Sequence, residues 1–233
     1  SITPASITPA SITPASITPT SITPASITVP AGARLVLATR NAHKVGELRA
    51  ILADVVASLG PDAVIGADAF PEIPDVVEDG VTFAENALLK ARALAQATGL
   101  VAVADDSGLA VDVLGGAPGI FSARWAGRHG DDAANLALLL AQLGDVRDEH
   151  RAAGFVCAAA LVTPDGREVV REGHLRGTLL RAPIGEGGFG YDPILLPDGE
   201  TRSAAQLTAA EKNAISHRGQ AFRALAPEIA AVL

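Results

Sequence analysis

Short apolar runs alternate with stretches of helical periodicity through residues 34–233. The runs RLVLA (34–38) and LVAVA (100–104) are typical of β-strands, and the second is apolar throughout, as expected of a central strand. The stretch 154–180 contains two strand-like runs around a Pro-Asp-Gly turn, which predicts an antiparallel hairpin. Strands that alternate with helices, together with one long hairpin, predict an α/β domain with a mixed sheet.

Helical spacing and capping residues predict the helices. Apolar residues recur at intervals of three and four after the sequence TRNAHK, and two Thr-x-x-Glu sequences have the form of a capping box. The predicted helices are one containing Val45, Leu48, Ile51, Leu52 and Val55, one from the capping box Thr82–Glu85 to about Thr98, one from Asp131 or Asp132 to Gly144, one begun by the capping box Thr208–Glu211, and a last one capped by Ser216 ahead of Pro227.

The first thirty residues have a different composition. Five-residue repeats of the type SITPA fill residues 1–25, and the first charged residue of the chain is Arg34. Proline in every repeat is incompatible with a regular helix, and the segment has no apolar face to bury. It also lacks the basic start and continuous apolar core of a secretory signal. We therefore predict a disordered tail over residues 1–30 and one folded domain over residues 34–233; a glycosylated or adhesive stalk is the alternative for the tail.

Composition narrows the class of partner. Of 233 residues, 48% are hydrophobic and 19% are charged, so a sizeable core is expected. The net charge of −8 argues against nucleic acid or an anionic membrane as a partner, and no apolar run has the roughly 18 residues of a membrane-spanning helix. An anionic small substrate is still compatible, because Mg²⁺ can join a carboxylate to a phosphate. The single cysteine, Cys157, excludes an internal disulfide and is expected to be buried, which fits a cytoplasmic protein.

The turn between the first strand and its helix is a candidate anion site. It contains Thr39, Arg40, Asn41 and Lys44, and the free N–H groups at the start of the helix point toward whatever lies above the strand. In this interpretation the helix start holds a phosphate chain and Lys44 clamps it as a point charge. An ordinary capped helix with a solvated lysine is the alternative.

Two adjacent carboxylates, Asp105 and Asp106, follow the apolar run 100–104. Acids at the end of a buried strand favour a metal site, and Glu78 of an acidic loop is a further candidate ligand. Adjacent residues of a strand point to opposite faces, so the two acids can address one site only if the strand has already ended. We therefore expect the strand to end at these acids, with one as ligand or base and the other as a supporting or capping group. Loop acids without a function are the alternative.

The stretch GEGGFGYDP (185–193) contains the spacing G-x-G-x-x-G. Pro183 and Pro193 leave no room for the helix that a dinucleotide-binding turn requires, so that interpretation is rejected. The chain has one Trp, one Tyr and six Phe, and two of these aromatic residues, Phe189 and Tyr191, stand in this stretch. Their place among glycines favours a surface for a flat ring, with a loop anchored in the core by Phe189 as the alternative.

A basic cluster, Lys212, Ser216, His217 and Arg218, stands at the start of the last predicted helix. An arginine beside a histidine can donate to carbonyl oxygens or phosphates, whereas a solvated basic patch is the alternative. Together the four clusters supply acids for Mg²⁺, cations for phosphates and aromatic rings for a purine. The sequence G-x-x-x-x-G-K-[ST] does not occur, which excludes a P-loop enzyme.

Five stretches resemble, in the same order, motifs of the inosine triphosphate pyrophosphatase family: LVLATRNAHKVGEL, TFAENALLKA, ADDSGLAVDVLGGAPGIFSAR, GGFGYDPI and LTAAEKNAISHRGQA. The resemblance covers essentially all of residues 34–233. It implies an elongated α/β fold with two lobes around a long mixed sheet, an active site in the cleft, and a homodimer. It also implies an enzyme that hydrolyses ITP, dITP and XTP to the monophosphate and pyrophosphate with Mg²⁺, and so cleanses the nucleotide pool.

The resemblance assigns roles to individual positions. Asp106 resembles the catalytic proton acceptor and a metal ligand, and Glu78 resembles a second metal ligand. The positions that resemble substrate-binding residues are Thr39, Arg40, Asn41, Ala42, His43, Lys44, Lys90, Ser107, Phe189, Gly190, Tyr191, Asp192, Lys212, His217 and Arg218. Many family members have glycine where this chain has Arg40. The arginine side chain narrows the turn and adds a positive charge near the triphosphate. The choice between Asp105 and Asp106 as the base stays open.

Three other functions fit part of the pattern. A sister family acts on thymidine or modified pyrimidine triphosphates, but it has a Ser-Pro-Arg turn where this chain has Thr39-Arg40-Asn41. A noncatalytic nucleotide sensor, or a surface protein presented by the repeats, belongs to a different class. The paired acids argue against a sensor.

Overall fold

The computed structural model describes residues 27–53, 59–60 and 62–233. Residues 1–26, with most of the repeats, lie outside the described residues, so the disorder of the tail stays a prediction. Ile27 and Val29, which the sequence analysis assigned to the tail, are partly buried against an apolar core. The packed part of the chain therefore includes residues 27–30, ahead of the predicted domain start at residue 34.

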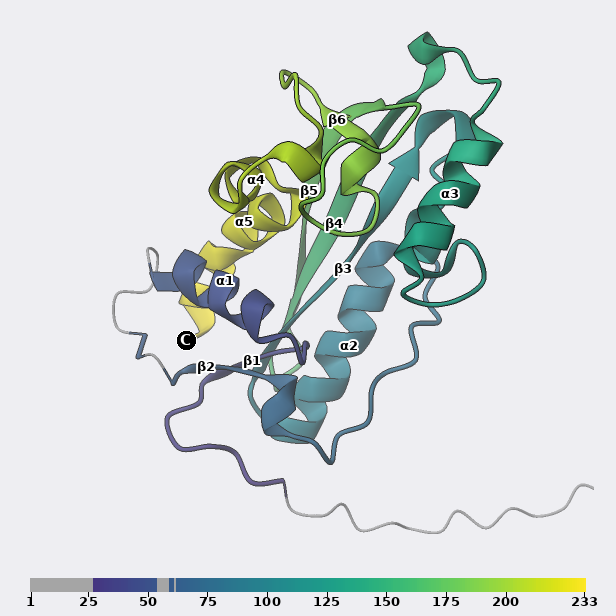
Figure 1. Cartoon of the computed structure of the whole chain (residues 1–233). Coiled ribbons are helices and arrows are strands. Elements are labelled where there is room, and N and C mark those ends of the chain that lie inside the picture. The colour runs from purple at the N-terminus through teal and green to yellow at the C-terminus, as the bar shows by residue number, and fades with distance from the viewer. Residues whose placement is uncertain (1–26, 54–58, 61) are drawn as a thin grey trace, which may run out of the picture.

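A mixed sheet is the centre of the fold (Figure 1). Within the described residues it has six strands in the order β2-β1-β3-β4-β5-β6. The strands are β1 (Leu35–Leu37), β2 (Val64–Gly66), β3 (Val101–Val111), β4 (Ala152–Val162), β5 (Glu168–Leu179) and β6 (Leu195–Pro197). β1 is parallel to β2 and β3, and the other neighbours are antiparallel. This confirms the predicted mixed α/β sheet, and β4 and β5 confirm the predicted hairpin.

Strand β3 is much longer than its sequence predicts. Asp105 and Asp106 lie near its middle, and the pairing with β4 continues as far as Val111, which is opposite Ala153. The prediction that the strand ends at the acids is therefore wrong. The physical reason is that the antiparallel partner β4 supplies backbone hydrogen bonds along this whole stretch, whatever the side chains are.

The other edge of β3 is covered for only a short distance. The last residue of β1, Leu37, is opposite Val103. Among the described residues no strand pairs with this edge beside Asp105 and Asp106. The short β1 therefore leaves an opening in the sheet next to the two acids.

Helices cover both faces of the sheet. In Figure 1, α1 (Ala42–Ala53) and α5 (His217–Val232) lie on one side of the long strands, and α2 (Phe83–Thr98) lies on the other. One core packs under α1 and α5, and a second packs under α2. A third core lies at the far end of β3–β5, beneath α3 (Asp132–Gln142) and beside β6. The long strands thus pass through two lobes, in agreement with the predicted architecture.

The predicted N-cap residues are confirmed. The predicted capping box is complete at Thr208–Glu211, whereas at α2 the side chain of Glu85 accepts from the backbone N–H of Val81 and not from that of Thr82. The side chains of Thr82 and Asp131 accept backbone hydrogen bonds at the starts of α2 and α3. Thr208 and Ser216 do the same for α4 (Ala209–Ile215) and α5. The last helix does not stop ahead of Pro227 as predicted, because buried residues on both sides of the proline hold it on the sheet. No helix within the described ranges is long and apolar enough to span a membrane.

Candidate functional site

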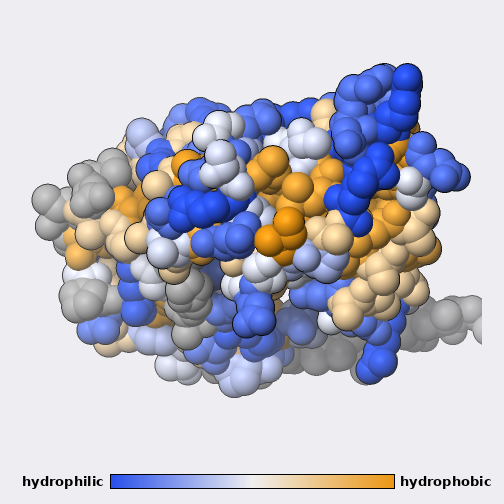
Figure 2. Space-filling model, turned by 45° about the horizontal axis from the view of Figure 1, so that its top comes forward, coloured by the Kyte–Doolittle hydropathy of each residue, from blue (hydrophilic) through white to orange (hydrophobic). Residues whose placement is uncertain are grey.

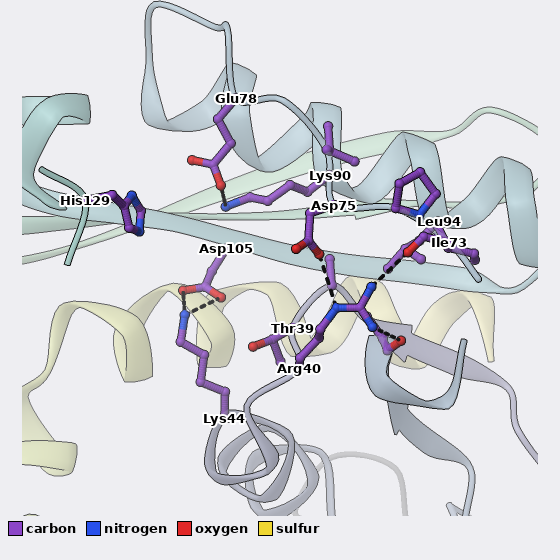
Figure 3. A pocket seen from close by; sticks show the side chains of 14 residues that line it. Thr39, Arg40, Lys44, Ile73, Asp75, Glu78, Lys90, Leu94, Asp105 and His129 are labelled. Atoms are coloured by element: carbon purple, nitrogen blue, oxygen red, sulfur yellow. Dashed lines mark hydrogen bonds and ion pairs between the residues drawn. The ribbon is translucent and has the colours of Figure 1, made fainter. Parts of the chain in front are cut away.

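A cavity of about 800 Å³ lies at the opening beside β3. A smaller cavity of about 430 Å³ adjoins it and shares Lys44, Glu78, Lys90 and Asp105 with it (Figure 3). The predicted site residues that line one or both cavities are Thr39, Arg40, Asn41, Lys44, Glu78, Lys90, Asp106, Ser107, Phe189, Lys212, His217 and Arg218. Helices, a strand and loops that are far apart in the sequence therefore contribute to one site.

The two adjacent acids reach this cavity from opposite faces of β3. Asp105 points to the face of α1 and α5, where it contacts Lys44 and Arg218. Asp106 points to the face of α2, where it contacts Asn86. Both line the cavity because the neighbouring strand β1 has ended, which leaves the edge of β3 accessible from both sides. The prediction that both acids can reach one site only if β3 has ended is therefore wrong.

Asp105 is a buried anion between two cations. Its side chain is 2% exposed, and its carboxylate lies 3.2 Å from the Nζ of Lys44. The Nε of Arg218 donates to the same carboxylate at 3.1 Å. Burial alone would raise the pKa of Asp105, but the positive charges of Lys44, Arg218 and Lys90 outweigh it and hold the pKa well below its usual range. Asp105 therefore stays charged and ties α1 to α5.

Asp106 has a different environment. Its Oδ2 accepts a hydrogen bond from the Nδ2 of Asn86 at 3.1 Å, and its Oδ1 lies 3.6 Å from the Nζ of Lys90. Burial raises the pKa of Asp106 above its ordinary value, although Lys90 and Asn86 partly offset this. The two neighbouring carboxylates thus differ in the direction of their pKa shifts.

Glu78 and Asp106 converge on one positive charge. The Nζ of Lys90 lies 3.1 Å from the Oε1 of Glu78 and 3.6 Å from the Oδ1 of Asp106 (Figure 3 shows the first contact). Two carboxylates around one cationic centre also suit a hard divalent cation. Among the described residues no three His, Cys, Asp or Glu side chains form a metal-binding cluster. A divalent cation here would therefore complete its coordination with water and ligand oxygens.

The predicted phosphate turn lies at the entrance of α1. The Oγ1 of Thr39 accepts a hydrogen bond from the backbone N–H of Asn41 at 3.1 Å. Lys44, in the first turn of the helix, points to Asp105 (Figure 3). Ala42 and His43 are the first residues of α1, but their side chains lie outside the described part of the structure. The turn thus presents a helix start and a lysine to the cavity.

Arg40 points along the smaller cavity toward a neighbouring loop (Figure 3). Its guanidinium donates to the carbonyl of Ile73 at 2.8 Å, to Asp75 at 3.2 Å and to the carbonyl of Ala67 at 3.4 Å. These contacts fasten the loop that carries Glu78 to the phosphate turn. The guanidinium of Arg40 was predicted to lie near the triphosphate, but in the structure it contacts this loop.

Phe189 lines the large cavity but not the smaller one. Its ring is 64% exposed, and the Nζ of Lys212 lies 4.8 Å from the ring centroid. Buried Asp192 accepts hydrogen bonds from the backbone N–H of Phe189 and from Lys212. An exposed aromatic face with a fixed backbone is suited to stacking on a flat ring.

Three predicted residues of the same loop, Gly190, Tyr191 and Asp192, line neither cavity. The ring of Tyr191 is 5% exposed, and its hydroxyl donates to the carbonyl of Ser122 at 2.9 Å. Gly190 donates its backbone N–H to Asp132 at 3.0 Å. These contacts fix the loop, and the structure offers the ring of Phe189, not that of Tyr191, for stacking.

His217 is buried at the back of the large cavity. Its ring stacks on Phe155 with a centroid distance of 5.1 Å. Burial, helped by the charges of Arg218 and Lys212, lowers the pKa of His217 to about 3, so the imidazole is neutral near pH 7. Its Nδ1 has no hydrogen-bond partner within the described ranges, and a ligand could supply one.

Several polar residues at this site were not predicted from the sequence, among them His129 and Asn86. His129 lines both cavities from the loop that precedes α3. Asn86 contacts Asp106 directly. Asn86 stands four residues before Lys90 in α2, so its place on the same helix face could have been read from the sequence.

Fold and site together define an α/β protein that can bind an anionic ligand with a flat ring at one end. Lysines and carboxylates line the part of the large cavity that is shared with the smaller one, whereas Phe189 and His217 line only the large cavity. The chain belongs to the Ham1 family, whose model matches residues 35–228.

Individual relatives cover the same part of the chain. The dITP/XTP pyrophosphatase of Streptomyces coelicolor is 73% identical over 200 residues, which are 86% of this chain and 98% of that protein. The dITP/XTP pyrophosphatase of Mycobacterium bovis is 55% identical over 196 residues, 84% of this chain and 95% of that protein.

Solved structures show the same fold. The crystal structure of a nucleoside-triphosphatase, dITP/XTP pyrophosphatase, from Mycobacterium abscessus superposes with a TM-score of 0.71 at 53% identity, covering 83% of this chain and 99% of that one. The Ham1 protein of Staphylococcus aureus superposes with a TM-score of 0.77 at 38% identity, covering 85% of this chain and 98% of that one.

Proposed function

We propose that this protein hydrolyses noncanonical purine nucleoside triphosphates, namely ITP, dITP and XTP, to the monophosphate and pyrophosphate. Close relatives named dITP/XTP pyrophosphatase support this assignment. The structural observation that carries it is a single cavity lined by two chemically distinct sets of side chains. Lys44, Lys90 and Glu78, in the part shared with the smaller cavity, suit a triphosphate and its cation, and Phe189 and His217, which line only the large cavity, suit a purine.

Mg²⁺ is the proposed cofactor, with Glu78 and Asp106 as its protein ligands. The fit rests on the two carboxylates that already surround the ammonium of Lys90. Mg²⁺ is commonly held by one or two carboxylates together with substrate phosphates and water. When bound, the ion supplies positive charge that neutralises the triphosphate.

We assign Asp106 as the proton acceptor. A water oxygen attacks the α-phosphorus and forms a P–O bond, the bond from this phosphorus to the bridging oxygen breaks, and a water proton passes to the carboxylate. Asp105 is unsuited to this task because Lys44 and Arg218 already engage its carboxylate. The carboxylate of Asp106 accepts a hydrogen bond from the amide of Asn86 at 3.1 Å, and the ammonium of Lys90 lies further away, at 3.6 Å.

The lysines and the start of α1 handle the negative charge. Lys44 and Lys90 stabilise the charge that develops on the leaving pyrophosphate. Thr39, Asn41 and the free N–H groups at the first turn of α1 hold the phosphate oxygens. Arg40 acts indirectly, because it holds the loop that carries Glu78.

Selection of the purine depends on hydrogen-bond donors. Hypoxanthine and xanthine carry a carbonyl oxygen at C6, which can accept from Arg218 or from backbone N–H groups, whereas adenine presents an amino group there. Phe189 stacks on any purine and adds affinity without discrimination. The neutral imidazole of His217 offers Nδ1 to a polar edge of the base or sugar.

A pyrophosphate-release assay with ITP, XTP, dITP, GTP, ATP and dTTP tests the proposal. We expect turnover of ITP, XTP and dITP to exceed that of ATP by at least roughly tenfold in kcat/KM, since the 6-amino group of adenine leaves a buried donor unpaired at a cost of ~1–3 kcal/mol. Preference for dTTP would instead indicate the pyrimidine-specific sister activity. Tight binding without turnover would indicate a nucleotide sensor.

We also propose a homodimer that acts in the cytoplasm, where the nucleotide pool is found. Support for a second copy comes from large apolar side chains at the surface, including Val113 at 49% and Phe121 at 50% exposure. On the face shown in Figure 2, apolar side chains gather between charged ones. Light scattering that gives the chain mass of 23.6 kDa rather than twice this value would refute the dimer.

A further inference from the structure

The amide of Asn86 joins the two carboxylates of the proposed cation site. Asn86 is 1% exposed in the first turns of α2. Its Nδ2 donates to the Oδ2 of Asp106 at 3.1 Å, and its Oδ1 accepts from the backbone N–H of Gly80 at 2.9 Å. Gly80 is two residues after Glu78 in the chain. One buried side chain therefore contacts one carboxylate directly and the loop of the other through its backbone.

Chemistry fixes the orientation of this amide. The N–H of Gly80 can only donate, so it must face the amide oxygen, and the amide nitrogen then faces Asp106. A reversed amide would place two donors together at Gly80 and two acceptors together at Asp106. The side chain therefore has one favourable orientation.

The loop is also held tightly against the start of α2. A Cβ atom on residue 80 would lie 2.7 Å from the Oδ1 of Asn86 and 2.8 Å from the Cβ of Glu85, so this close approach requires glycine. The N–H of Val81 donates to Glu85 at 2.6 Å. The Glu78 loop is thus fastened to α2 at a point close to its carboxylate.

We propose that Asn86 is a positioning residue that sets the separation between the carboxylates of Glu78 and Asp106. The inference rests on the proposed function, because it concerns the cation site of that reaction. Lys90, one helical turn further along α2, faces the same two carboxylates, so a single helix face organises the whole site. Removal of Asn86 frees the loop from Asp106 while both carboxylates remain in the chain.

Binding of Mn²⁺ to the full chain, followed by electron paramagnetic resonance without nucleotide, tests this inference. Loss of a residue that orients a metal ligand weakens metal binding by roughly 10- to 100-fold, and we expect Asn86→Ala to fall in this range. Asn135→Ala is the matched control. Asn135 is also 1% exposed, and its amide joins a backbone carbonyl to a backbone N–H, but in α3. We expect this control to bind Mn²⁺ as the wild type does.

A double-mutant cycle separates positioning from simple loss of packing. In a Glu78→Gln background the loop has no carboxylate to position, so Asn86→Ala should weaken Mn²⁺ binding by a clearly smaller factor than in the wild type. In turnover of dITP, Asn86→Ala should raise the Mg²⁺ concentration needed for half-maximal rate, and saturating Mg²⁺ should restore most of kcat. Gly80→Ala, which displaces the loop but keeps the amide, should act in the same direction and serves if Asn86→Ala does not fold.

Three results would overturn the inference. These are wild-type Mn²⁺ affinity in Asn86→Ala, an equal loss in the Asn135→Ala control, and an equal factor in the two backgrounds of the cycle. Wild-type protein that hydrolyses dITP without measurable Mn²⁺ binding would overturn the positioning role and leave the proposed reaction standing. Wild-type protein that binds Mn²⁺ but hydrolyses no purine triphosphate would overturn the proposed function instead.

Discussion

Neutralising Asp105 should destabilise the protein far more than neutralising an exposed acid. Asp105→Asn keeps the size of the side chain but removes its charge from between Lys44 and Arg218. Those two side chains are only 26% and 14% exposed, so water compensates them incompletely. The substitution therefore leaves two partly buried cations beside each other without their shared anion.

The contact distances give the magnitude. At 3.1–3.2 Å, each ion pair is worth about 5 kcal/mol before desolvation at an effective dielectric constant of about 20. Breaking a buried pair by removing one partner typically costs about 3–5 kcal/mol net. We take about 3 kcal/mol, since the asparagine oxygen still accepts hydrogen bonds. For a domain of this size that corresponds to a fall in melting temperature of roughly 6–12 °C.

The stability difference should also depend on pH. The pKa of Asp105 is lower in the folded than in the unfolded protein, so its stabilisation is fully present above the ordinary carboxyl pKa of about 4. It is lost as the pH falls below that value toward the lower pKa of the folded state. Calorimetric melting of wild type and Asp105→Asn should therefore show a constant gap from pH 7 to about pH 5, which narrows below pH 4.

Asp112→Asn is the control for this experiment. Asp112 also pairs with an arginine, Arg176, at 2.6 and 2.9 Å, but the two side chains are 52% and 46% exposed. An exposed pair contributes about 1 kcal/mol or less. If Asp105→Asn melts within about 2 °C of Asp112→Asn, the buried charges do not stabilise the fold and the reasoning fails.

Three further predictions concern the reaction and the tail. Asp106→Asn should keep the melting temperature and lose roughly 10²- to 10⁴-fold in turnover of ITP, and near wild-type turnover would remove Asp106 from the mechanism. Phe189→Ala should raise KM for ITP and ATP by similar factors. Arg218→Ala should lower kcat/KM for ITP more than for ATP. An equal loss of kcat/KM for both substrates would show that Arg218 binds phosphate. Deletion of residues 1–26 should leave the melting temperature unchanged. Deletion of residues 1–29 should lower it by a few degrees, because this deletion also removes the contacts of Ile27 and Val29. Identical melting of both truncated proteins would contradict the role of these two residues.

Local features of the fold could be predicted from the sequence because their causes are local. A capping threonine and the glutamate three residues later lie within one helical turn, so both the start of α2 and that of α4 follow from the residues themselves. The Pro-Asp-Gly turn likewise marks the β4–β5 hairpin. Four polar clusters were proposed from the residue pattern and their individual roles were assigned by resemblance; the structure brings most of these residues to one cavity.

Features that depend on partners distant in the chain could not be predicted in the same way. The end of β3 is decided by β4, which lies some fifty residues further along, and not by the two acids. Arg40 has a charge suited to phosphate, but the backbone carbonyl of Ile73 and the carboxylate of Asp75 engage it. Tyr191 has an aromatic ring suited to stacking, but the third core and the carbonyl of Ser122 bury it.

The alternation of Asp105 and Asp106 along β3 makes this strand intolerant of insertions and deletions. Adding one residue before the pair would exchange the faces of the two carboxylates, so the anion that neutralises Lys44 would turn to α2 and the proposed base would turn to α5. The β4–β5 turn at residues 163–167 has no such constraint, because it lies beyond both paired strands. Length variation among homologous chains should therefore be absent between residues 101 and 111 and common at this turn. A single peptide bond in β3 thus keeps two chemically different halves of the site in register.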